Sequence, residues 1–130
     1  MLCKHILLVE DDFDSRQIFL DTLRDIAPTC ACDTANNGVE AIEYLHHKVP
    51  DLIITDLNMP KIDGLEFIEE VKKIPVTVPL VIWSSASLEE NLAVRLGING
   101  AVEKPATYKD LYALIQRMVN YCGLSSVVGL

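Results

Sequence analysis

The sequence has few of the residues that mark disordered or fibrous chains. It holds six glycines and six prolines in 130 residues, while half of its residues are apolar and 23% are charged. This composition excludes the disordered, collagenous and low-complexity classes. No apolar run approaches the roughly 18 to 20 residues of a membrane span, and residues 1–5 lack the layout of a signal peptide. We therefore expect a single globular domain with no membrane segment, in the cytoplasm.

Positive charge is also scarce. The chain has 11 Lys and Arg residues against 19 Asp and Glu, a net charge of -8. Such a surface repels the phosphate backbone of nucleic acids and anionic lipid headgroups. We expect no nucleic-acid partner and no membrane partner.

Cysteine and histidine do not form a recognisable metal-binding pattern. Of the four cysteines, Cys30 and Cys32 form a lone C-x-C, and Cys3 and Cys122 stand far from it. On a strand Cys30 and Cys32 share one face, which suits two small hydrophobic side chains in a core. We interpret the three histidines, His5, His46 and His47, as solvated or structural, because neighbouring helical side chains point about 100° apart.

Hydrophobic periodicity predicts alternating strands and helices. Residues 6–9, 52–55 and 80–83 are apolar runs rich in β-branched residues, as in strands buried on both faces, and 30–35 and 101–103 are weaker strand candidates. Helical spacing recurs in 19–26, 41–45, 65–71, 88–92 and 111–119. Five strands joined by five helices predict a doubly wound α/β fold with a parallel sheet.

Short polar motifs mark the predicted helix ends. Asn37 with Glu40 and Ser87 with Glu90 have capping-box spacing, and Thr107 with Asp110 is a looser version. Gly97 follows the fourth helical pattern, where a left-handed cap is expected.

Acidic residues collect where two predicted strands end. Glu10, Asp11, Asp12 and Asp14 follow the first strand, and Asp56 follows the third. Doubly wound sheets bind ligands beyond the carboxyl ends of their strands. If these two strands are neighbours, the carboxylates repel one another unless a divalent cation lies among them, and oxygen-only ligands favour Mg2+ over Zn2+. Helix capping is the alternative explanation, above all for Asp14.

Two further strand ends carry groups that bind anions. Ser84 closes the fourth strand, and Lys104 follows the fifth. With Asp56 as nucleophile, Mg2+ beside it, and Ser84 and Lys104 on the other phosphoryl oxygens, the set predicts phosphoryl transfer to a carboxylate. The sequence has no glycine-rich nucleotide loop, so we expect the phosphoryl donor to be a phosphoprotein or a small phosphorylated molecule.

These residues resemble the receiver domain of two-component response regulators. The resemblance rests on ILLVEDD at 6–12, PDLIITDLNMP at 50–60, Asp63 with Gly64, Ser84, and Lys104 with Pro105. It implies a flavodoxin-like fold with strand order 2-1-3-4-5, a receiver domain over residues 1–121 and a tail over 122–130. It also implies a stand-alone receiver similar to the chemotaxis regulator.

The resemblance assigns roles to individual residues. It implies that Asp56 accepts a phosphoryl group from a histidine kinase or a phosphotransfer protein. Mg2+ would be held by Asp12, Asp56 and the main-chain carbonyl of Asn58, with Asp11 acting through a water. Lys104 would pair with the phosphoryl group, Ser84 would move toward it, and the bond before Pro105 is often cis in the family.

Two departures affect the output rather than the chemistry. Ala101 stands where many receivers carry an aromatic switch residue, and Ala106 replaces a common phenylalanine. We expect a downstream protein partner reached by contact, and a weak homodimer through the fourth helix, fifth strand and fifth helix. Two alternatives stay open: a receiver-like binding module that is never phosphorylated, and a Mg2+-dependent phosphatase, which would want an acid where Asn58 stands.

Overall fold

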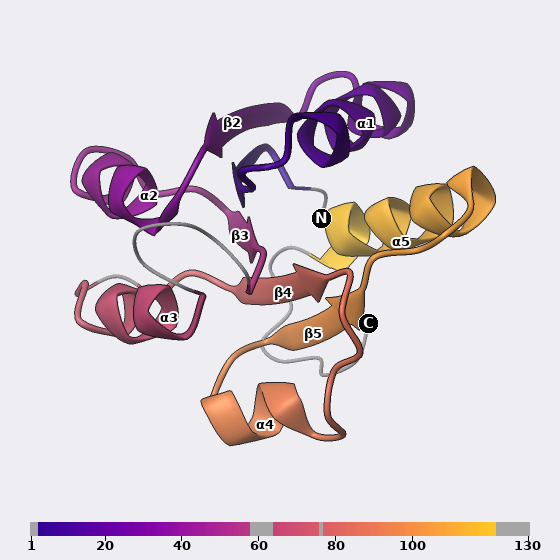
Figure 1. Ribbon diagram of the computed structural model, residues 1–130. Helices are drawn as coiled ribbons and strands as arrows, with labels where there is room; N and C mark the ends of the chain where they lie inside the picture. The colour runs from indigo at the N-terminus through magenta and orange to yellow at the C-terminus, as the bar shows by residue number, and fades with distance from the viewer. Residues whose placement is uncertain (1–2, 58–63, 76, 122–130) are drawn as a thin grey trace.

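A computed structural model of the chain describes residues 3–57, 64–75 and 77–121. These residues form one parallel sheet of five strands in the order β2-β1-β3-β4-β5 (Figure 1). The strands are β1 (His5–Val9), β2 (Ala31–Ala35), β3 (Leu52–Thr55), β4 (Leu80–Ser84) and β5 (Gly100–Glu103). The predicted strand order and flavodoxin-like receiver fold are confirmed.

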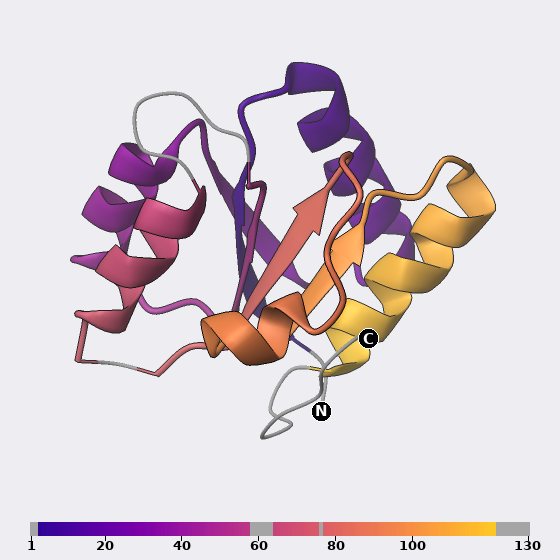
Figure 2. The same ribbon diagram turned by 60° about the horizontal axis from the view of Figure 1, so that its bottom comes forward.

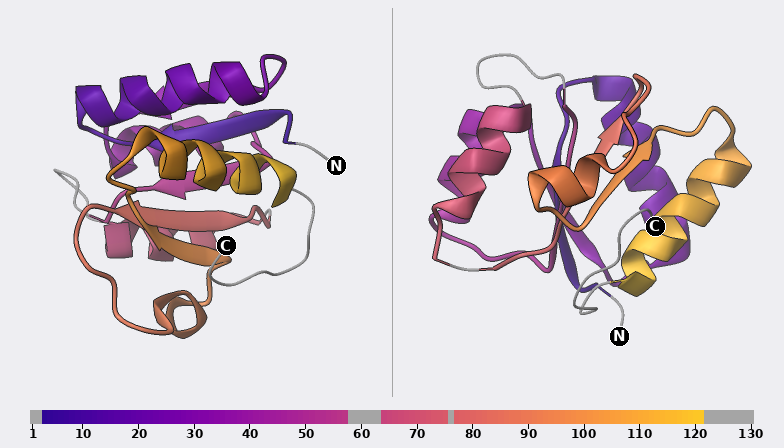
Figure 3. Two further views of the ribbon diagram at one scale, coloured as in Figure 1. Left: turned by 90° about the vertical axis from the view of Figure 1, so that its right-hand side faces the viewer. Right: turned by 90° about the horizontal axis from the view of Figure 1, so that it is seen from below.

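Helices cover both faces of the sheet. They are α1 (Phe13–Ile26), α2 (Gly38–Leu45), α3 (Gly64–Lys72), α4 (Leu92–Leu96) and α5 (Tyr108–Tyr121). Figures 2 and 3 show α1 and α5 side by side on one face, with α2 and α3 on the other. The carboxyl ends of all five strands therefore meet at one edge, as the predicted site requires.

The core forms two layers because strand side chains alternate between the faces. Ile6, Leu8, Ile54 and Val81 pack toward α1 and α5, whereas Leu7, Val9, Ile53 and Ile82 pack in the other layer. Every residue of β3 and β4 is buried. This explains why these strands are continuous apolar runs in the sequence.

The predicted start of the fourth helix is wrong. The Ser87 and Glu90 spacing placed it near 88, but α4 spans only Leu92–Leu96. Asn91 precedes it in the left-handed region, with φ 63°. A local capping pattern cannot form its reciprocal bonds unless the backbone enters the helix at that point, and here the turn through Asn91 delays the entry.

Other predicted helix ends are confirmed. The Asn37 side chain accepts a hydrogen bond from the Glu40 backbone N–H at 2.9 Å, and Thr107 Oγ1 accepts one from the Asp110 N–H at 3.2 Å. Gly97 ends α4 in the left-handed region with φ 70°. These bonds satisfy backbone groups that a helix leaves unpaired at its ends.

The cysteines and histidines have largely structural surroundings. Cys30 and Cys32 are free and pack beside the α1/α5 core layer, as expected. Cys3 is disulfide-bonded, which the sequence did not predict, and Cys122 lies outside the described residues. His5 is hydrogen-bonded to Asp33 at 2.8 Å, and His46 and His47 are exposed.

Two further expectations concern the backbone and the membrane. The described residues contain no cis peptide bond, so the bond before Pro105 is not cis here. Among the same residues, no helix has the length and apolar character that crossing a membrane demands. The proposed tail at 122–130 lies outside the described part of the chain.

Candidate functional site

The ends of β1 and β3 bring two acidic residues side by side. Val9 pairs with Thr55 in the parallel ladder, and the Asp56 N–H continues it by donating to the Val9 carbonyl at 3.1 Å. The next residues along each strand are therefore Glu10 and Asp56. Both are buried, with 0% and 6% of their surface exposed.

Three carboxylates form a cluster at this edge. Glu10, Asp11 and Asp56 each place a carboxylate oxygen within 4.8 Å of the other two. Glu10 and Asp56 form its buried side, and Asp11 is exposed. The predicted crowding of carboxylates between the first and third strands is thus present, and its donor set consists of oxygen atoms alone.

Asp12 lies outside this cluster, although the family resemblance implied that it is a Mg2+ ligand. Its Oδ2 accepts a hydrogen bond from the Ser15 N–H at 2.8 Å, so it caps α1. Hydrogen bonds from Ser15, the backbone one first, hold the pKa of Asp12 below its usual range. Because β1 ends at Val9 and α1 begins at Phe13, residue 12 falls on the N-cap position, while Asp14 lies in the first turn.

Glu10, rather than Asp12, belongs to the cluster with Asp11 and Asp56. Its Oε2 accepts a hydrogen bond from the Asp12 N–H at 3.2 Å. Burial raises the pKa of Glu10, although Lys104 and the Asp12 N–H oppose that shift. The sequence signal for Glu10 is its position directly after the strand, which is also the position of Asp56 after β3.

Lys104 supplies the positive charge of the site. Its Nζ lies 2.6 Å from Glu10 Oε1 and 2.9 Å from Asp56 Oδ2. Burial opposes the charge of Lys104, but hydrogen bonds and attraction from Glu10 and Asp56 outweigh it and raise the Lys104 pKa. The pairing of the fifth strand end with Asp56 agrees with the arrangement expected from the sequence.

Ser84 and Ala101 are the remaining predicted residues that the structure describes. Ser84 is fully buried, and its Oγ accepts a hydrogen bond from the Ala86 N–H at 3.2 Å. Ala101 pairs with Ile82 and packs in the layer of α2 and α3. Asn58 lies outside the described residues.

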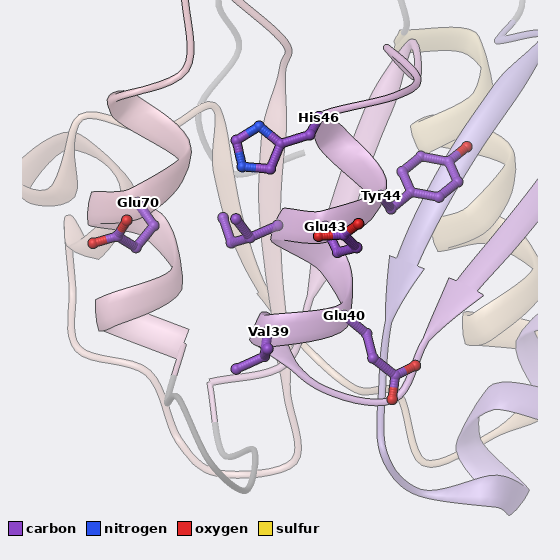
Figure 4. A pocket seen from close by; sticks show the side chains of 7 residues that line it. Val39, Glu40, Glu43, Tyr44, His46 and Glu70 are labelled. Atoms are coloured by element: carbon purple, nitrogen blue, oxygen red, sulfur yellow. The ribbon is translucent and has the colours of Figure 1, made fainter.

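A separate groove lies between α2 and α3 (Figure 4). It has a volume of about 760 Å³ and shares no residue with the carboxylate cluster. Six of the residues that line it are Val39, Glu40, Glu43, Tyr44, His46 and Glu70. The groove lies over the helices rather than at the carboxyl edge of the sheet, so the candidate site is the cluster with Lys104.

Known proteins with similar sequences include response regulators and the sensor histidine kinase RcsC. The chain is 30% identical over 119 residues to the probable C4-dicarboxylate response regulator DctR of Bacillus subtilis, covering 89% of this chain and 52% of DctR. This chain thus spans about half the length of that relative. It is 33% identical over 106 residues to the chemotaxis protein CheY of Halobacterium salinarum, covering 80% of this chain and 87% of CheY.

Solved structures agree in fold. The phosphorylated cyanobacterial phytochrome response regulator RcpA superposes with a TM-score of 0.81 at 27% identity, covering 95% of this chain and 96% of RcpA. TrrA of Thermotoga maritima, solved in complex with Mg2+ and BeF, gives 0.73 at 26% identity, covering 88% and 98%. The response regulator receiver domain family matches residues 6–116. The chain therefore belongs to the family of response regulator receiver domains, with the acidic pocket of Glu10, Asp11 and Asp56 that is typical of a phosphoaspartate site.

Proposed function

We propose that this receiver accepts a phosphoryl group on Asp56, in a Mg2+-dependent reaction, and signals by contact with another protein. The observation that carries the proposal is the contact of Lys104 Nζ with Asp56 Oδ2, at 2.9 Å, within a cluster of three carboxylates. A lone buried carboxylate paired with lysine could be structural. The adjoining acids add negative charge that a structural ion pair does not need.

The residues of the cluster fit Mg2+. Carboxylate oxygens are ligands that this hard cation accepts, and it keeps several waters, which suits a cluster with one exposed side. Asp11 and Asp56 would hold it, together with the Asn58 carbonyl implied by the family resemblance, and Glu10 would act from the buried side. When bound, the ion would neutralise charge on the phosphoryl oxygens. TrrA, a similar response regulator, was solved in complex with Mg2+ and BeF, which supports Mg2+ as the cation.

The chain's own residues then perform the transfer. An oxygen of Asp56 forms the new bond to phosphorus, while the bond from phosphorus to the donor breaks and the donor keeps that electron pair. Lys104 already lies beside Asp56 and is placed to neutralise the oxygens of the arriving group. Ser84 would offer its hydroxyl after leaving the Ala86 N–H. These roles amount to positioning and electrostatic stabilisation.

The phosphoryl donor and the output partner are both proteins in this proposal. Receiver domains partner with histidine kinases, and a histidine kinase or a histidine phosphotransfer protein would supply the group here. The net charge of -8 disfavours a nucleic-acid target for the output. We expect the signal to pass to a protein that contacts α4, β5 and α5, or to a second copy of the chain on that surface.

Incubation with acetyl phosphate and Mg2+, followed by intact-protein mass spectrometry, tests the proposal. The wild type should gain the mass of one phosphoryl group, and Asp56→Ala should gain none. Asp14→Asn is the matched control, because it removes an exposed acid of α1 and should leave the gain unchanged. No gain on the wild type would reject the proposal and favour a binding module that works without phosphorylation.

A further inference from the structure

Strand register places a tryptophan beside the two buried acids. Val9, Thr55 and Ile82 pair across β1, β3 and β4, and Val9 and Ile82 pack in the α2/α3 layer. The following residues are Glu10, Asp56 and Trp83, and alternation turns them toward α1 and α5. Trp83 accordingly packs in the α1/α5 layer. Glu10, Asp56 and Trp83 thus form one row across the sheet, and the indole comes next to Asp56.

Lys104 crosses this tryptophan to reach the acids. Its N–H donates to the Ser84 carbonyl at 2.7 Å, which fixes its backbone beyond the end of β4. From there the side chain reaches back to β3 and β1, and Nζ lies 4.9 Å from the centre of the Trp83 ring. An ammonium at this distance from the face of an indole is attracted by the ring quadrupole.

The ring, rather than the indole N–H, accounts for tryptophan at this position. Trp83 is 2% exposed, and Phe19 packs edge-on against it with ring centres 5.4 Å apart. Its Nε1 has no hydrogen-bond partner among the described residues. A buried tryptophan usually pairs that group, so the unpaired N–H is a cost that a phenylalanine or leucine would avoid. Neither phenylalanine nor leucine would present an equally strong negative face to the ammonium.

We propose that Trp83 is a positioning residue that holds the ammonium of Lys104 beside Asp56. The inference rests on the proposed function. When Asp56 becomes an acyl phosphate, negative charge moves from its carboxylate to the phosphoryl oxygens, and the ammonium must move with it. The hydrogen bond from Lys104 to Asp56 has a fixed direction, whereas the attraction of a ring face is broad. Trp83 therefore keeps the ammonium of Lys104 beside Asp56 while it exchanges the Asp56 carboxylate for the phosphoryl oxygens.

Fluorinated tryptophan separates this electrostatic role from packing. The chain has one tryptophan, so biosynthetic replacement by mono-, di- and trifluorotryptophan alters Trp83 alone. Each fluorine withdraws electrons from the ring face with little change in its shape. We expect the rate of phosphorylation by acetyl phosphate to fall stepwise, by about three- to tenfold over the series.

A second measurement tests the contact without relying on the reaction. The urea midpoint of the wild-type background should fall along the fluorine series, and that of Lys104→Met should fall less or not at all. Equal shifts in both backgrounds would mean that fluorine acts through packing and would overturn the inference. A constant phosphorylation rate across the series would also overturn it, while leaving the proposed function intact. If unfluorinated protein takes no phosphoryl group, the proposed function fails, and the midpoints still decide whether Trp83 holds Lys104.

Discussion

Lys104 Nζ lies 2.9 Å from Asp56 Oδ2, although the two residues are 48 positions apart in the chain. The same nitrogen lies 2.6 Å from Glu10 Oε1. One ammonium with 15% of its side chain exposed therefore offsets two buried carboxylates. The stability of the fold and the chemistry of the site depend on the same residue.

Replacing Lys104 by Met should destabilise the protein at neutral pH. The methionine keeps the apolar stem but leaves Glu10 and Asp56 facing each other, and breaking a buried ion pair costs about 3 kcal/mol in unfolding free energy. Burial raises the pKa of Glu10. A carboxyl whose pKa is raised by folding makes the folded state less stable as pH rises through that pKa.

The loss in Lys104→Met should therefore shrink as pH falls through the raised pKa of Glu10, and also on addition of Mg2+. Urea unfolding at several pH values measures it, with Lys109→Met as the control because Lys109 is exposed on α5. Equal stability of Lys104→Met and the wild type at pH 7 would contradict the assignment of this ion pair.

Mg2+ should change the fluorescence of Trp83 with a saturating response. The cation would repel the ammonium that lies over the indole and alter the surroundings of the ring. Asp11→Asn removes a carboxylate from the cluster and should weaken Mg2+ binding by about tenfold or more.

Asp12→Asn is the matched control for the magnesium titration. Asparagine caps helices as well as aspartate does, so α1 should be preserved. Asp12 lies outside the cluster, and its variant should bind Mg2+ much as the wild type does. If Asp12→Asn weakens binding as strongly as Asp11→Asn, the ligand set originally expected from the family resemblance is the better one.

Gly64→Ala should damage both the fold and the site. A Cβ on Gly64 would lie 2.6 Å from Leu57 Cα and 2.8 Å from the Asp56 carbonyl oxygen. These are backbone atoms, which cannot rotate aside, so the start of α3 or the chain after Asp56 must move. Overpacking of this kind costs about 1 to 3 kcal/mol. We expect lower stability together with slower phosphorylation by acetyl phosphate.

Gly97→Ala provides the comparison for Gly64. Gly97 has φ +70°, and a Cβ there would meet only the flexible end of Lys72. Strain in the left-handed region should lower stability by about 1 kcal/mol. Phosphorylation should be unchanged, because Gly97 ends α4 away from Asp56. If Gly64→Ala and Gly97→Ala slow phosphorylation equally, the packing of Gly64 on Asp56 and Leu57 does not explain the slower rate.

The fold was predictable where burial alone determines the pattern. Residues 52–55 were predicted as a strand and form β3 with the same bounds, because a strand buried on both faces must be apolar throughout. The start of α4 was not predictable from Ser87 and Glu90, because a capping pattern also occurs where the chain turns first, as at Asn91.

The site was predictable at single strand ends and ambiguous in the acidic run. Asp56 and Lys104 each follow one strand, so their positions were fixed once the strands were placed. Four acids follow β1, and their roles depend on where the strand stops and the helix starts. Residue 83 ends a predicted strand, and its closeness to Lys104 depends on tertiary contacts that the sequence pattern does not show.

Asp33 should contribute a stabilisation that disappears in acid. Its Oδ2 accepts a hydrogen bond from the Tyr44 hydroxyl at 2.7 Å and lies 2.8 Å from His5 Nε2. The hydrogen bond from Tyr44 first, and then that from His5, lowers the pKa of Asp33. A carboxyl with a lowered pKa stabilises the fold above its ordinary pKa, and the stabilisation is lost as pH falls through the lowered value.

The variant Asp33→Asn removes this charge while keeping an oxygen that Tyr44 can bond. With 42% of the Asp33 side chain exposed, solvent screening limits the difference in unfolding free energy to below about 1 kcal/mol at pH 7. The difference should shrink toward zero in acid, as pH falls from 7 through the lowered pKa of the Asp33 carboxyl. Urea unfolding of both proteins across this range measures it, and Glu90→Gln serves as an exposed control. A difference that stays constant throughout acid titration of the carboxyl would mean that Asp33 acts through shape rather than charge.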